Sequence, residues 1–524
     1  MPSLTLPPRV VTWNRRNEFL VFALLPFLVA LALSWGAAVD DVFINLRYAA
    51  NVVHGLGPVF NQGTRVQGFT SPLGLVTAIF SYIFSPSNYE LFLNKLLTTI
   101  IGGVALWRAC DLIRWFDFRP VVRRLLFVVV GVNWILAYAD GNGLETSLLI
   151  WFVLEVSIRG LDPARSFAPA TTAAAALVVF TRIDAIGALG VFGLFLLIFN
   201  YRTLRECTWF AGAGAALVTT LVAEKLLFGS ILPSTYYAKH IPTNRAVHAG
   251  LHYLINPQRL YSRPLTETML LLFVVVGFGA IVALVTRHPS RPLIGLVLGQ
   301  LIFILATGGD WMPGDRFLAP VVPAMVVLGG VGINWLFSEE SWRLAAGIVA
   351  AGMLVLSSIL PYTVQRHPVT SITGLTNAPL LAQGGGLYES VWLELPQLTS
   401  CLAPGARVAT TEVGYFGFMR PDLNILDMRG LNDMAIARTV PGYDHTYVGD
   451  IDGNWSLPND PVGHVLTGFH PAVIITNDGY RPALALNGTY RAVRSFGLPT
   501  IRPFYIYVPV GTPVPACLLQ RLPA

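Results

Sequence analysis

Long apolar segments recur along this chain, and they constrain its fold more than any other feature. A transmembrane helix needs about 20 predominantly apolar residues to cross the hydrocarbon core of a bilayer. Eleven candidate segments lie at about residues 19–33, 91–107, 125–139, 144–158, 168–182, 185–199, 208–223, 268–286, 293–306, 318–337 and 344–361. The chain is 54% hydrophobic and only 12% charged, whereas soluble domains have about 25% charged residues. We therefore expect a polytopic α-helical membrane protein with about eleven transmembrane helices.

Two apolar segments need separate interpretation. The segment that begins at Phe19 follows three arginines and is long enough to span a membrane. No convincing cleavage site follows it, so we expect a retained first helix and not a signal peptide. The segment Pro72–Phe84 is apolar but short. We expect it to form a helix that lies on the outer leaflet or dips into it.

The charges of the loops predict the orientation of these helices, because cytoplasmic loops carry an excess of Lys and Arg. With the N-terminus inside, every inner loop is basic: Arg114, Arg119, Arg123 and Arg124; Arg159 and Arg165; Arg202 and Arg205; Arg287 and Arg291; and Arg343. This distribution accounts for the net charge of +6. No basic patch interleaved with aromatic residues indicates nucleic-acid binding.

The composition changes at about residue 362. Residues 362–524 contain no membrane-length apolar run. They contain the strand-like pieces RVATTE, PAVIIT and FYIYVPV between turns rich in Gly, Pro, Asn and Asp. We predict two domains: residues 1–361, a transmembrane domain with an outer loop at 40–87, and residues 362–524, a soluble α/β domain. An odd number of spans places this second domain outside the cytoplasm.

The four cysteines divide between the two domains. Cys401 and Cys517 lie in the C-terminal segment, which we place in an oxidising compartment, so we expect them to form a disulfide. Cys110 and Cys207 fall at the inner side of the membrane. We expect these two thiols to stay reduced.

Unusual polar clusters share one side of the predicted transmembrane domain. They are Asp40–Asp41, DGNGLET (140–146), TRIDA (181–185), LPSTYYAKH (232–240) and GGDWMPGDRF (308–317). Ionisable groups at a membrane edge are costly and are usually functional. Five such clusters on one face indicate a single site that opens outward.

The adjacent carboxylates Asp40 and Asp41 begin an amphipathic helix, because the apolar residues that follow are three to four apart. Asp40 and Arg47 share its polar face, roughly 10 Å apart along the axis. This arrangement suits a carboxylate at a reaction centre and a cation for a nearby phosphate. In the alternative interpretation, the two Asp residues only cap the helix N-terminus. The pattern leaves both interpretations open.

These motifs also match a known family. The stretch DDVFINLRYAANVVHGLGPVFNQGTRVQGFTSPL (40–73) resembles the first outer loop of GT-C glycosyltransferases. It is most similar to terminal arabinofuranosyltransferases that use decaprenyl-phospho-arabinose, and to the related pilin arabinosyltransferases. Pro58 and Gln67 are small departures from the pattern of that group. The pieces GNGLET, RIDA, STYYAKH and GGDWMPGDRFLAPVVPA match later motifs in order, and LDMRGLND (426–433) resembles a D-x-x-GL-x-D segment.

The resemblance implies a GT-C catalytic domain in a bacterial inner (cytoplasmic) membrane. It implies transfer of a sugar, expected to be D-arabinofuranose, from a polyprenyl-phosphate donor to a glycan or protein acceptor on the outer face. A carboxylate on the first outer loop is the usual catalytic group of GT-C enzymes, and the match falls on Asp40 and Asp41. The other implied site residues are Arg47, Lys239, His240 and Arg316 for the donor phosphate, and Tyr48, Glu145, Asp184, Tyr237, Asp310 and Trp311 for the rest of the substrate.

Several of these residues have a structural alternative. Arg316 either binds a phosphate in the bidentate manner that suits arginine, or it pairs with Asp315 or Asp310. Lys239 and His240 are either phosphate ligands or solvated loop residues. Glu145 and Asp184 are either substrate contacts or structural partners of Arg182, and we favour the structural role. Trp311 is either a substrate contact or a membrane-interface anchor.

The chemistry that we expect needs a carboxylate near the anomeric carbon and cations on the departing phosphate, because the transition state is oxocarbenium-like. Asp41 or Asp40 acts as a general base, which gives inversion, or as a nucleophile, which gives retention. We favour Asp41, because it shares a polar face with Asn45 and Tyr48. The family's β donor and β linkage imply retention.

No cofactor is expected, because the sequence has no dense set of Asp and His metal ligands. Some GT-C enzymes use a divalent metal, so a metal requirement stays open. Three rival interpretations are a GT-C transferase for another lipid-linked sugar such as mannose or glucose, a lipid-linked-sugar transporter, and a scaffold of the cell envelope. A transporter should have internal inverted repeats and charges near the midplane, and we find neither in the sequence.

Overall fold

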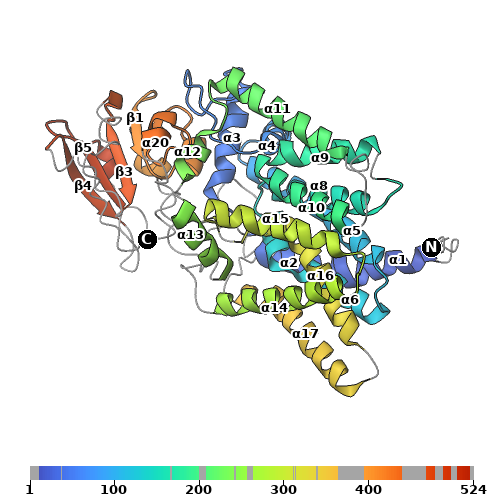
Figure 1. Ribbon diagram of the computed structural model, residues 1–524. Helices are drawn as coiled ribbons and strands as arrows, with labels where there is room; N and C mark the ends of the chain where they lie inside the picture. Colours follow the sequence, from blue (N-terminus) through green and yellow to red (C-terminus); the bar gives the residue numbers. More distant parts are fainter. Residues whose placement is uncertain are drawn as a thin grey trace.

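The structure is a computed structural model of the 524-residue chain. It describes residues 11–36, 38–165, 168–199, 208–240, 243–255, 264–310, 312, 314–337, 340–363, 395–439, 468–477, 488–496 and 504–519. Figure 1 shows a bundle of helices with a small sheet at one end. A helical part followed by a C-terminal α/β part fits the predicted fold class.

The helical part is built from elements with the following bounds: α1 Val11–Phe19, η1 Leu20–Leu24, α2 Leu25–Ser34, α3 Asp40–Val53, α4 Pro72–Phe84, α5 Glu90–Trp115, α6 Pro120–Val132, α7 Trp134–Gly141, α8 Thr146–Leu161, α9 Pro169–Thr181, η2 Ile183–Ala185, α10 Ile186–Phe199, α11 Trp209–Phe228, α12 Ser234–Lys239, α13 Thr243–Ile255, α14 Pro264–Val285, α15 Arg291–Thr307, η4 Ala319–Val321, α16 Val322–Leu336, α17 Ser341–Ile359 and η5 Leu360–Thr363. Proline stands in the first turn of α4, α6, α9, α15 and α16, where its missing N–H is not needed. The core centres on α16, which is buried along nearly its whole length, and on α5, α6 and α8.

In the described part of the chain, five helices are long and apolar enough to cross a membrane, or six if the bent pair α6–α7 is one span. The five are Arg15–Ser34, Glu90–Trp115, Trp209–Phe228, Ala319–Leu336 and Ser341–Tyr362. Other apolar helices, such as α9 and α10, are shorter than this criterion requires. The predicted number of eleven spans is therefore not confirmed.

Asn133 ends α6 and begins α7, and the two helices are bent by 41° at this point. Its side-chain oxygen accepts a hydrogen bond from the backbone N–H of Leu136, and its amide group donates one to Ser358 Oγ. The side chain thus caps α7 and ties the break to α17. The bend brings the DGNGLET segment, which starts in α7, to the end of the bundle next to α3.

The predicted helix Pro72–Phe84 is present as α4. Ser71 caps it, because its Oγ accepts a hydrogen bond from the N–H of Gly74. One face packs on neighbouring helices, and the opposite face exposes Val76, Phe80, Ile83 and Phe84. An apolar exposed face on so short a helix fits the predicted contact with lipid.

The C-terminal domain, as we call the described residues from 395 onward, contains a five-stranded sheet of order β2-β1-β3-β5-β4. The strands are β1 Arg407–Thr410, β2 Asn424–Asp427, β3 Val473–Asn477, β4 Tyr490–Phe496 and β5 Phe504–Pro509. Strand β1 is parallel to β2 and β3, whereas β5 is antiparallel to β3 and β4. Three short helical segments accompany them: α19 Gly414–Met419, α20 Met434–Thr439 and η7 Ala516–Leu519. The sequence predicted β1, β3 and β5 but missed β2 and β4.

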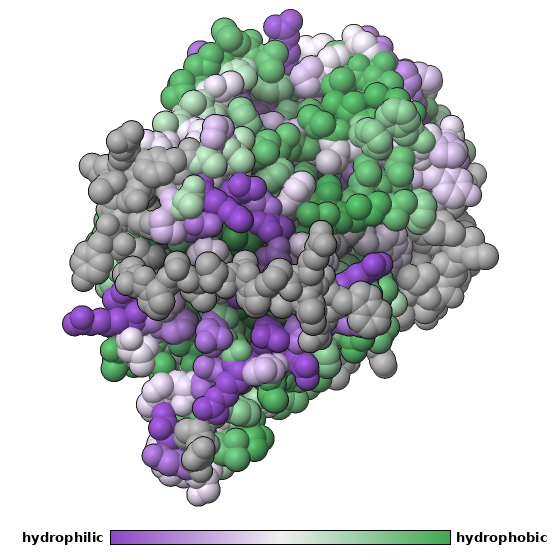
Figure 2. All heavy atoms as spheres, turned by 90° about the vertical axis from the view of Figure 1, so that its right-hand side faces the viewer, coloured by the Kyte–Doolittle hydropathy of each residue, from purple (hydrophilic) through white to green (hydrophobic). Residues whose placement is uncertain are grey.

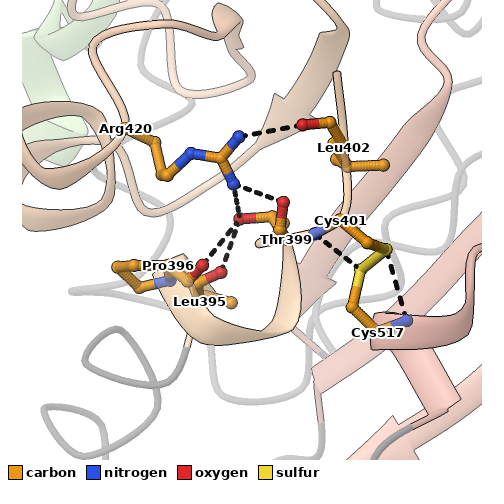
Figure 3. The surroundings of a disulfide bond; sticks show 7 residues. All are labelled: Leu395, Pro396, Thr399, Cys401, Leu402, Arg420 and Cys517. Carbon is orange, nitrogen blue, oxygen red and sulfur yellow. Dashed lines mark hydrogen bonds between the residues drawn. A yellow bond between two sulfur atoms is a disulfide. The ribbon is translucent and has the colours of Figure 1, made fainter. Parts of the chain in front are cut away.

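The predicted disulfide between Cys401 and Cys517 is present, with the two Cα atoms 5.6 Å apart. Figure 3 shows that Arg420 lies beside it and donates hydrogen bonds to the carbonyl groups of Thr399 and Leu402. The bond joins the segment before β1 to the end of the domain. Cys110 is buried and free, as predicted, and Cys207 lies outside the described residues.

The loop between α5 and α6 lies with α1 at the end of the bundle away from the sheet (Figure 1). Figure 2 looks at this end, and hydrophilic residues lie across its middle between hydrophobic surfaces. Ion pairs lie within and between the helices at this end, namely Arg108 with Asp111 and Glu155, Arg123 and Arg124 with Glu18, and Arg159 with Glu155. This distribution is compatible with the positive-inside prediction, and the sidedness itself stays a prediction.

Candidate active site

Helix α3 begins with the two adjacent carboxylates, as the sequence predicted. Its N-cap residue is Val39, whose side chain makes no capping hydrogen bond. Asp40 and Asp41 thus lie in the first turn, where the helix dipole stabilises negative charge. Asp40 is buried, whereas Asp41 is partly exposed. Of the two, only Asp41 keeps a surface that a substrate can reach in this conformation.

Asp40 caps a helix of the C-terminal domain. Its Oδ2 accepts a hydrogen bond from the backbone N–H of Gly414 (2.7 Å), and its Oδ1 accepts one from Tyr415 (2.8 Å). These N–H groups begin α19, and the first N–H groups of a helix have no partner within it. Burial raises the pKa of Asp40 to about 6, although the two hydrogen bonds and Arg429 lower it. Asp40 therefore caps a helix, as one of the two interpretations predicted, but this helix is α19 and not its own helix α3.

Glycines allow the backbone of α19 to approach α3 closely. A Cβ atom at Gly414 would overlap the carbonyl oxygen of Asp40, and one at Gly417 would lie 2.8 Å from Phe60 and 2.9 Å from Arg47. These distances are shorter than a normal Cβ contact. The two glycines are thus required by the contact between α3 and the C-terminal domain.

Arg47 holds this same contact from the other end of α3. Its guanidinium donates hydrogen bonds to the carbonyl groups of Phe60 (2.7 Å), Gly417 (2.5 Å) and Leu423 (3.2 Å), and to Asn61 Oδ1 (3.1 Å). The residue is 2% exposed. Its donors are directed at the backbone, so the structure assigns Arg47 to the domain contact and not to the predicted donor phosphate. The correction has a simple cause, since arginine satisfies buried carbonyl groups as well as it binds phosphate.

Tyr48 and Asn61 complete the framework around α3. The Tyr48 hydroxyl donates to the carbonyl of Val66 (2.7 Å) and accepts from the N–H of Gly68 (2.9 Å), and its ring is fully buried. Asn61 exchanges two hydrogen bonds with the backbone of Ile425 in β2. Tyr48 therefore fixes the loop after α3, and its predicted contact with substrate does not occur in this buried position.

The other polar motifs meet near the start of α3. Val42 lies against Gly143, where an added Cβ would come within 3.2 Å of it. Two residues further on, Glu145 accepts a hydrogen bond from Arg182 (3.1 Å). Arg182 also donates to Asp184 (3.0 Å). The alternative that makes Glu145 and Asp184 the partners of Arg182 therefore describes their positions in the structure.

A second group of charges lies next to Arg182. Arg316 forms a buried ion pair with Asp310. Burial alone would raise the pKa of Asp310, but Arg316, Lys239 and Arg182 outweigh it and lower the pKa below its ordinary value. Asp310 is thus ionised among three cations. The five motifs DDVF, DGNGLET, TRIDA, STYYAKH and GGDWMPGDRF are joined by these contacts and electrostatic interactions.

Asp315 is the group that sequence reasoning did not single out as a site residue. It is fully buried, it has a left-handed backbone (φ 45°), and neither carboxylate oxygen has a hydrogen-bond partner in the described part of the chain. Burial and the nearby charge of Asp310 raise its pKa to about 8. Of its two possible acidic partners, Arg316 pairs with Asp310 in this structure. The sequence signal was the second Asp of GGDWMPGDRF, directly after a glycine.

Three of the remaining predicted residues lie in or next to α12. Lys239 and Tyr237 are partly exposed, and His240 is exposed with its ring 5.7 Å from that of Tyr236. The ring of Tyr237 has the guanidinium of Arg438, from α20, 5.2 Å above it. Trp311 lies outside the described residues. The structure thus brings Lys239 to the Asp310 group, and it leaves His240 at the surface.

No group of three or more His, Cys, Asp or Glu side chains that could hold a metal ion occurs among the residues with described positions. The five motifs supply a partly exposed carboxylate, Asp41, and the cations Arg182, Lys239 and Arg316, which act on Asp310. A carboxylate and cations in one site suit a reaction in which a glycosyl carbon gains positive charge and a phosphate departs.

Comparisons with known proteins give both a sequence relative and related folds. A family described as "Domain of unknown function (DUF8728)" matches residues 390–509. The chain is 24% identical over 515 residues to the terminal beta-(1->2)-arabinofuranosyltransferase of Mycobacterium tuberculosis (strain ATCC 25618 / H37Rv), with 78% of this chain and 81% of the relative covered.

Two solved structures of ArnT from Cupriavidus metallidurans have a similar fold, each at 15% identity over 95% of this chain and 98% of ArnT. The TM-score is 0.55 for the apo state and 0.50 for the state bound to undecaprenyl phosphate. The predicted resemblance to GT-C glycosyltransferases, and to terminal arabinofuranosyltransferases in particular, is confirmed.

Proposed function

We propose that this chain is a membrane glycosyltransferase that moves D-arabinofuranose from a polyprenyl-phosphate donor to a glycan or protein acceptor of the cell envelope. The observation that carries the proposal is the convergence of the five polar motifs beside the first turn of α3, where Asp41 is partly exposed. The sugar is suggested by the name of the curated relative. The lipid phosphate is suggested by the ArnT structure with undecaprenyl phosphate.

In this proposal Asp41 is the reacting carboxylate. It attacks the anomeric carbon, the bond from that carbon to the phosphate oxygen breaks, and polyprenyl phosphate leaves with the bonding electrons. The acceptor hydroxyl then displaces the carboxylate, and its proton passes to the released phosphate. The two displacements retain the anomeric configuration. If Asp41 instead takes the proton of the acceptor hydroxyl in one step, the configuration inverts.

Lys239 and Arg316 are the proposed ligands of the departing phosphate. Both lie by Asp310, whose charge keeps Arg316 in place. Cations at this position stabilise negative charge that grows on the phosphate in the transition state. Glu145 and Asp184 act indirectly in this proposal, because they hold the guanidinium of Arg182 in position. His240 remains a proposed ligand of the donor phosphate, and Tyr237 and Trp311 remain proposed contacts of the substrate.

The proposed location is the bacterial inner membrane, with the C-terminal domain and the site outside the cytoplasm. The basic residues at the far end of the bundle support this orientation. No cofactor is part of the proposal, and addition of a chelator to the assay tests whether a divalent metal is needed.

Turnover with a panel of polyprenyl-phospho-sugars tests the function directly. The purified protein should release polyprenyl phosphate from the arabinofuranose donor much faster than from the mannose or glucose donors. Preference for a hexose donor would support the glycosyltransferase activity but overturn the proposed sugar. Binding of the donors without release of polyprenyl phosphate from any of them would contradict the proposal and favour a carrier.

A further inference from the structure

The contact between α3 and the C-terminal domain surrounds the proposed reacting carboxylate. Asp40, on one side of Asp41, binds the N–H groups of Gly414 and Tyr415. Phe43, on the other side, packs edge-to-face on the ring of Tyr415, with ring centroids 5.0 Å apart. The C-terminal domain therefore touches α3 both before and after Asp41, within a single turn.

The part of the C-terminal domain that binds Asp40 follows the carboxyl end of strand β1. Strand β1 ends at Thr410 and leads into α19, and the neighbouring strand β2 ends at Asp427. In open α/β sheets, functional residues lie at this edge of the strands. The residues that bind Asp40 therefore lie at the edge of the sheet where functional residues of such domains are usually found.

This edge is stiffened by its own hydrogen bonds. Asp427 accepts three of them, from the N–H of Arg429 (2.9 Å), the N–H of Asn432 (2.8 Å) and the amide group of Asn432 (3.0 Å). The loop 428–432 is thereby closed on the end of β2. Arg429 then reaches Glu412, just before α19, with an N–O distance of 2.7 Å. A second ordered loop thus supports the start of α19.

Charge links this loop to the reacting residues. Arg429 stabilises the ionised form of Asp40, while Asp41 opposes it. The group that anchors α19, the group proposed to react and a cation of the C-terminal domain are therefore electrostatically coupled. An element that served only to cover the helical part would not need a buried ionised carboxylate at its contact, since burial of such a charge is costly.

We propose that the C-terminal domain is a working part of the reaction centre, in which α19 binds Asp40 and thereby fixes the direction of Asp41. Asp40 is a positioning residue, and Asp41 is the catalytic residue. Successive residues of a helix point about 100° apart, so holding Asp40 against α19 fixes the direction in which the Cα–Cβ bond of Asp41 leaves the helix. The inference rests on the proposed function, and it gives a role to the segment 390–509 that matches a domain of unknown function.

The test compares variants of the full-length purified protein in single-turnover transfer from a synthetic polyprenyl-phospho-arabinose, with donor affinity measured separately. Gly414→Ala pushes α19 away from α3, because the added Cβ would overlap Asp40. It should lower the transfer rate at least tenfold and change donor affinity less than threefold. Gly468→Ala is the matched control, since a Cβ there meets nothing within 4 Å, and its rate should be unchanged.

Asp40→Asn is the second variant, and it decides the question if Gly414→Ala does not fold. An amide can accept a hydrogen bond from only one of the two N–H groups, so the rate should again fall at least tenfold with donor affinity retained. Asp41→Asn should abolish transfer. Inactive Asp41→Asn beside near-normal Asp40→Asn and Gly414→Ala variants would overturn the positioning role alone. A near-normal rate for Asp41→Asn would overturn the proposed function itself.

Discussion

Replacement of Arg182 by glutamine tests how much the buried ion pairs of the site contribute to the stability of the fold. The guanidinium is the only link in the described residues between Glu145 and Asp184, with N–O distances of 3.1 Å and 3.0 Å. Glu145 and Arg182 are buried, whereas the Asp184 side chain is 24% exposed. Glutamine preserves part of the length of the side chain but removes its charge.

The expected cost follows from burial. Breaking a buried ion pair by removal of one partner costs about 3–5 kcal/mol, because the other charge is left without compensation. The bond to the more exposed Asp184 adds at most about 1 kcal/mol, since a partly hydrated carboxylate can turn to water. We therefore expect Arg182→Gln to lower the free energy of unfolding by about 3–5 kcal/mol. Removing both charges with Arg182→Gln and Glu145→Gln together should recover more than half of that loss.

The assay is denaturant unfolding in detergent micelles, arranged as a double-mutant cycle of Arg182 and Glu145. The control is Arg165→Gln, because Arg165 also pairs with a carboxylate but its side chain is 59% exposed. That variant should cost less than about 1 kcal/mol. A loss below about 1 kcal/mol for Arg182→Gln, or no recovery in the double variant, would refute the view that buried charge compensation holds the site.

Three further outcomes are expected. Replacing Cys401 and Cys517 with serine should lower the free energy of unfolding by about 3–5 kcal/mol relative to the oxidised wild type, because the bond closes a loop of 116 residues. Equal stability of the variant and the oxidised wild type would exclude this contribution. The pKa of Asp315 is raised from 3.8 to about 8, so the folded protein holds a proton that the unfolded chain has lost between these pH values. This proton should therefore contribute a fall in stability of about 1.4 kcal/mol per pH unit as the pH rises through that window. The curve of Asp315→Asn should be less steep than that of the wild type by this amount, whereas parallel curves would show that Asp315 titrates normally. A cysteine placed at Asn454, a position outside the described residues, should react with an impermeant reagent in intact cells, and protection would reverse the predicted orientation.

The sequence predicted those features that depend on the spacing of residues within one segment. The first-turn carboxylates of α3 and the helix Pro72–Phe84 follow from local spacing and capping, and both are present. The strands β1, β3 and β5 have runs of β-branched and aromatic residues. Strand β2, with the sequence NILD, has a single β-branched residue, and it is a strand because it pairs with β1.

Long-range partners were not predictable from spacing. Asp40 pairs with N–H groups 374 and 375 residues away, and a local pattern shows only that a carboxylate can cap a helix. The phosphate role of Arg47 was predicted from the matched motif and from the polar face that it shares with Asp40, but carbonyl groups of the C-terminal domain accept hydrogen bonds from its guanidinium. Arg316 likewise pairs with Asp310, six residues away, and not with the adjacent Asp315, whose backbone is left-handed.

The central claim is that a carboxylate of the first turn of α3 reacts with a polyprenyl-phosphate sugar. The measurement that tests it most directly is release of polyprenyl phosphate from polyprenyl-phospho-arabinofuranose in a single turnover, with wild type and Asp41→Asn compared at saturating donor. The account predicts release by the wild type, and a rate at least 100-fold lower for Asp41→Asn with donor affinity retained. Release by Asp41→Asn at a rate close to that of the wild type would contradict it.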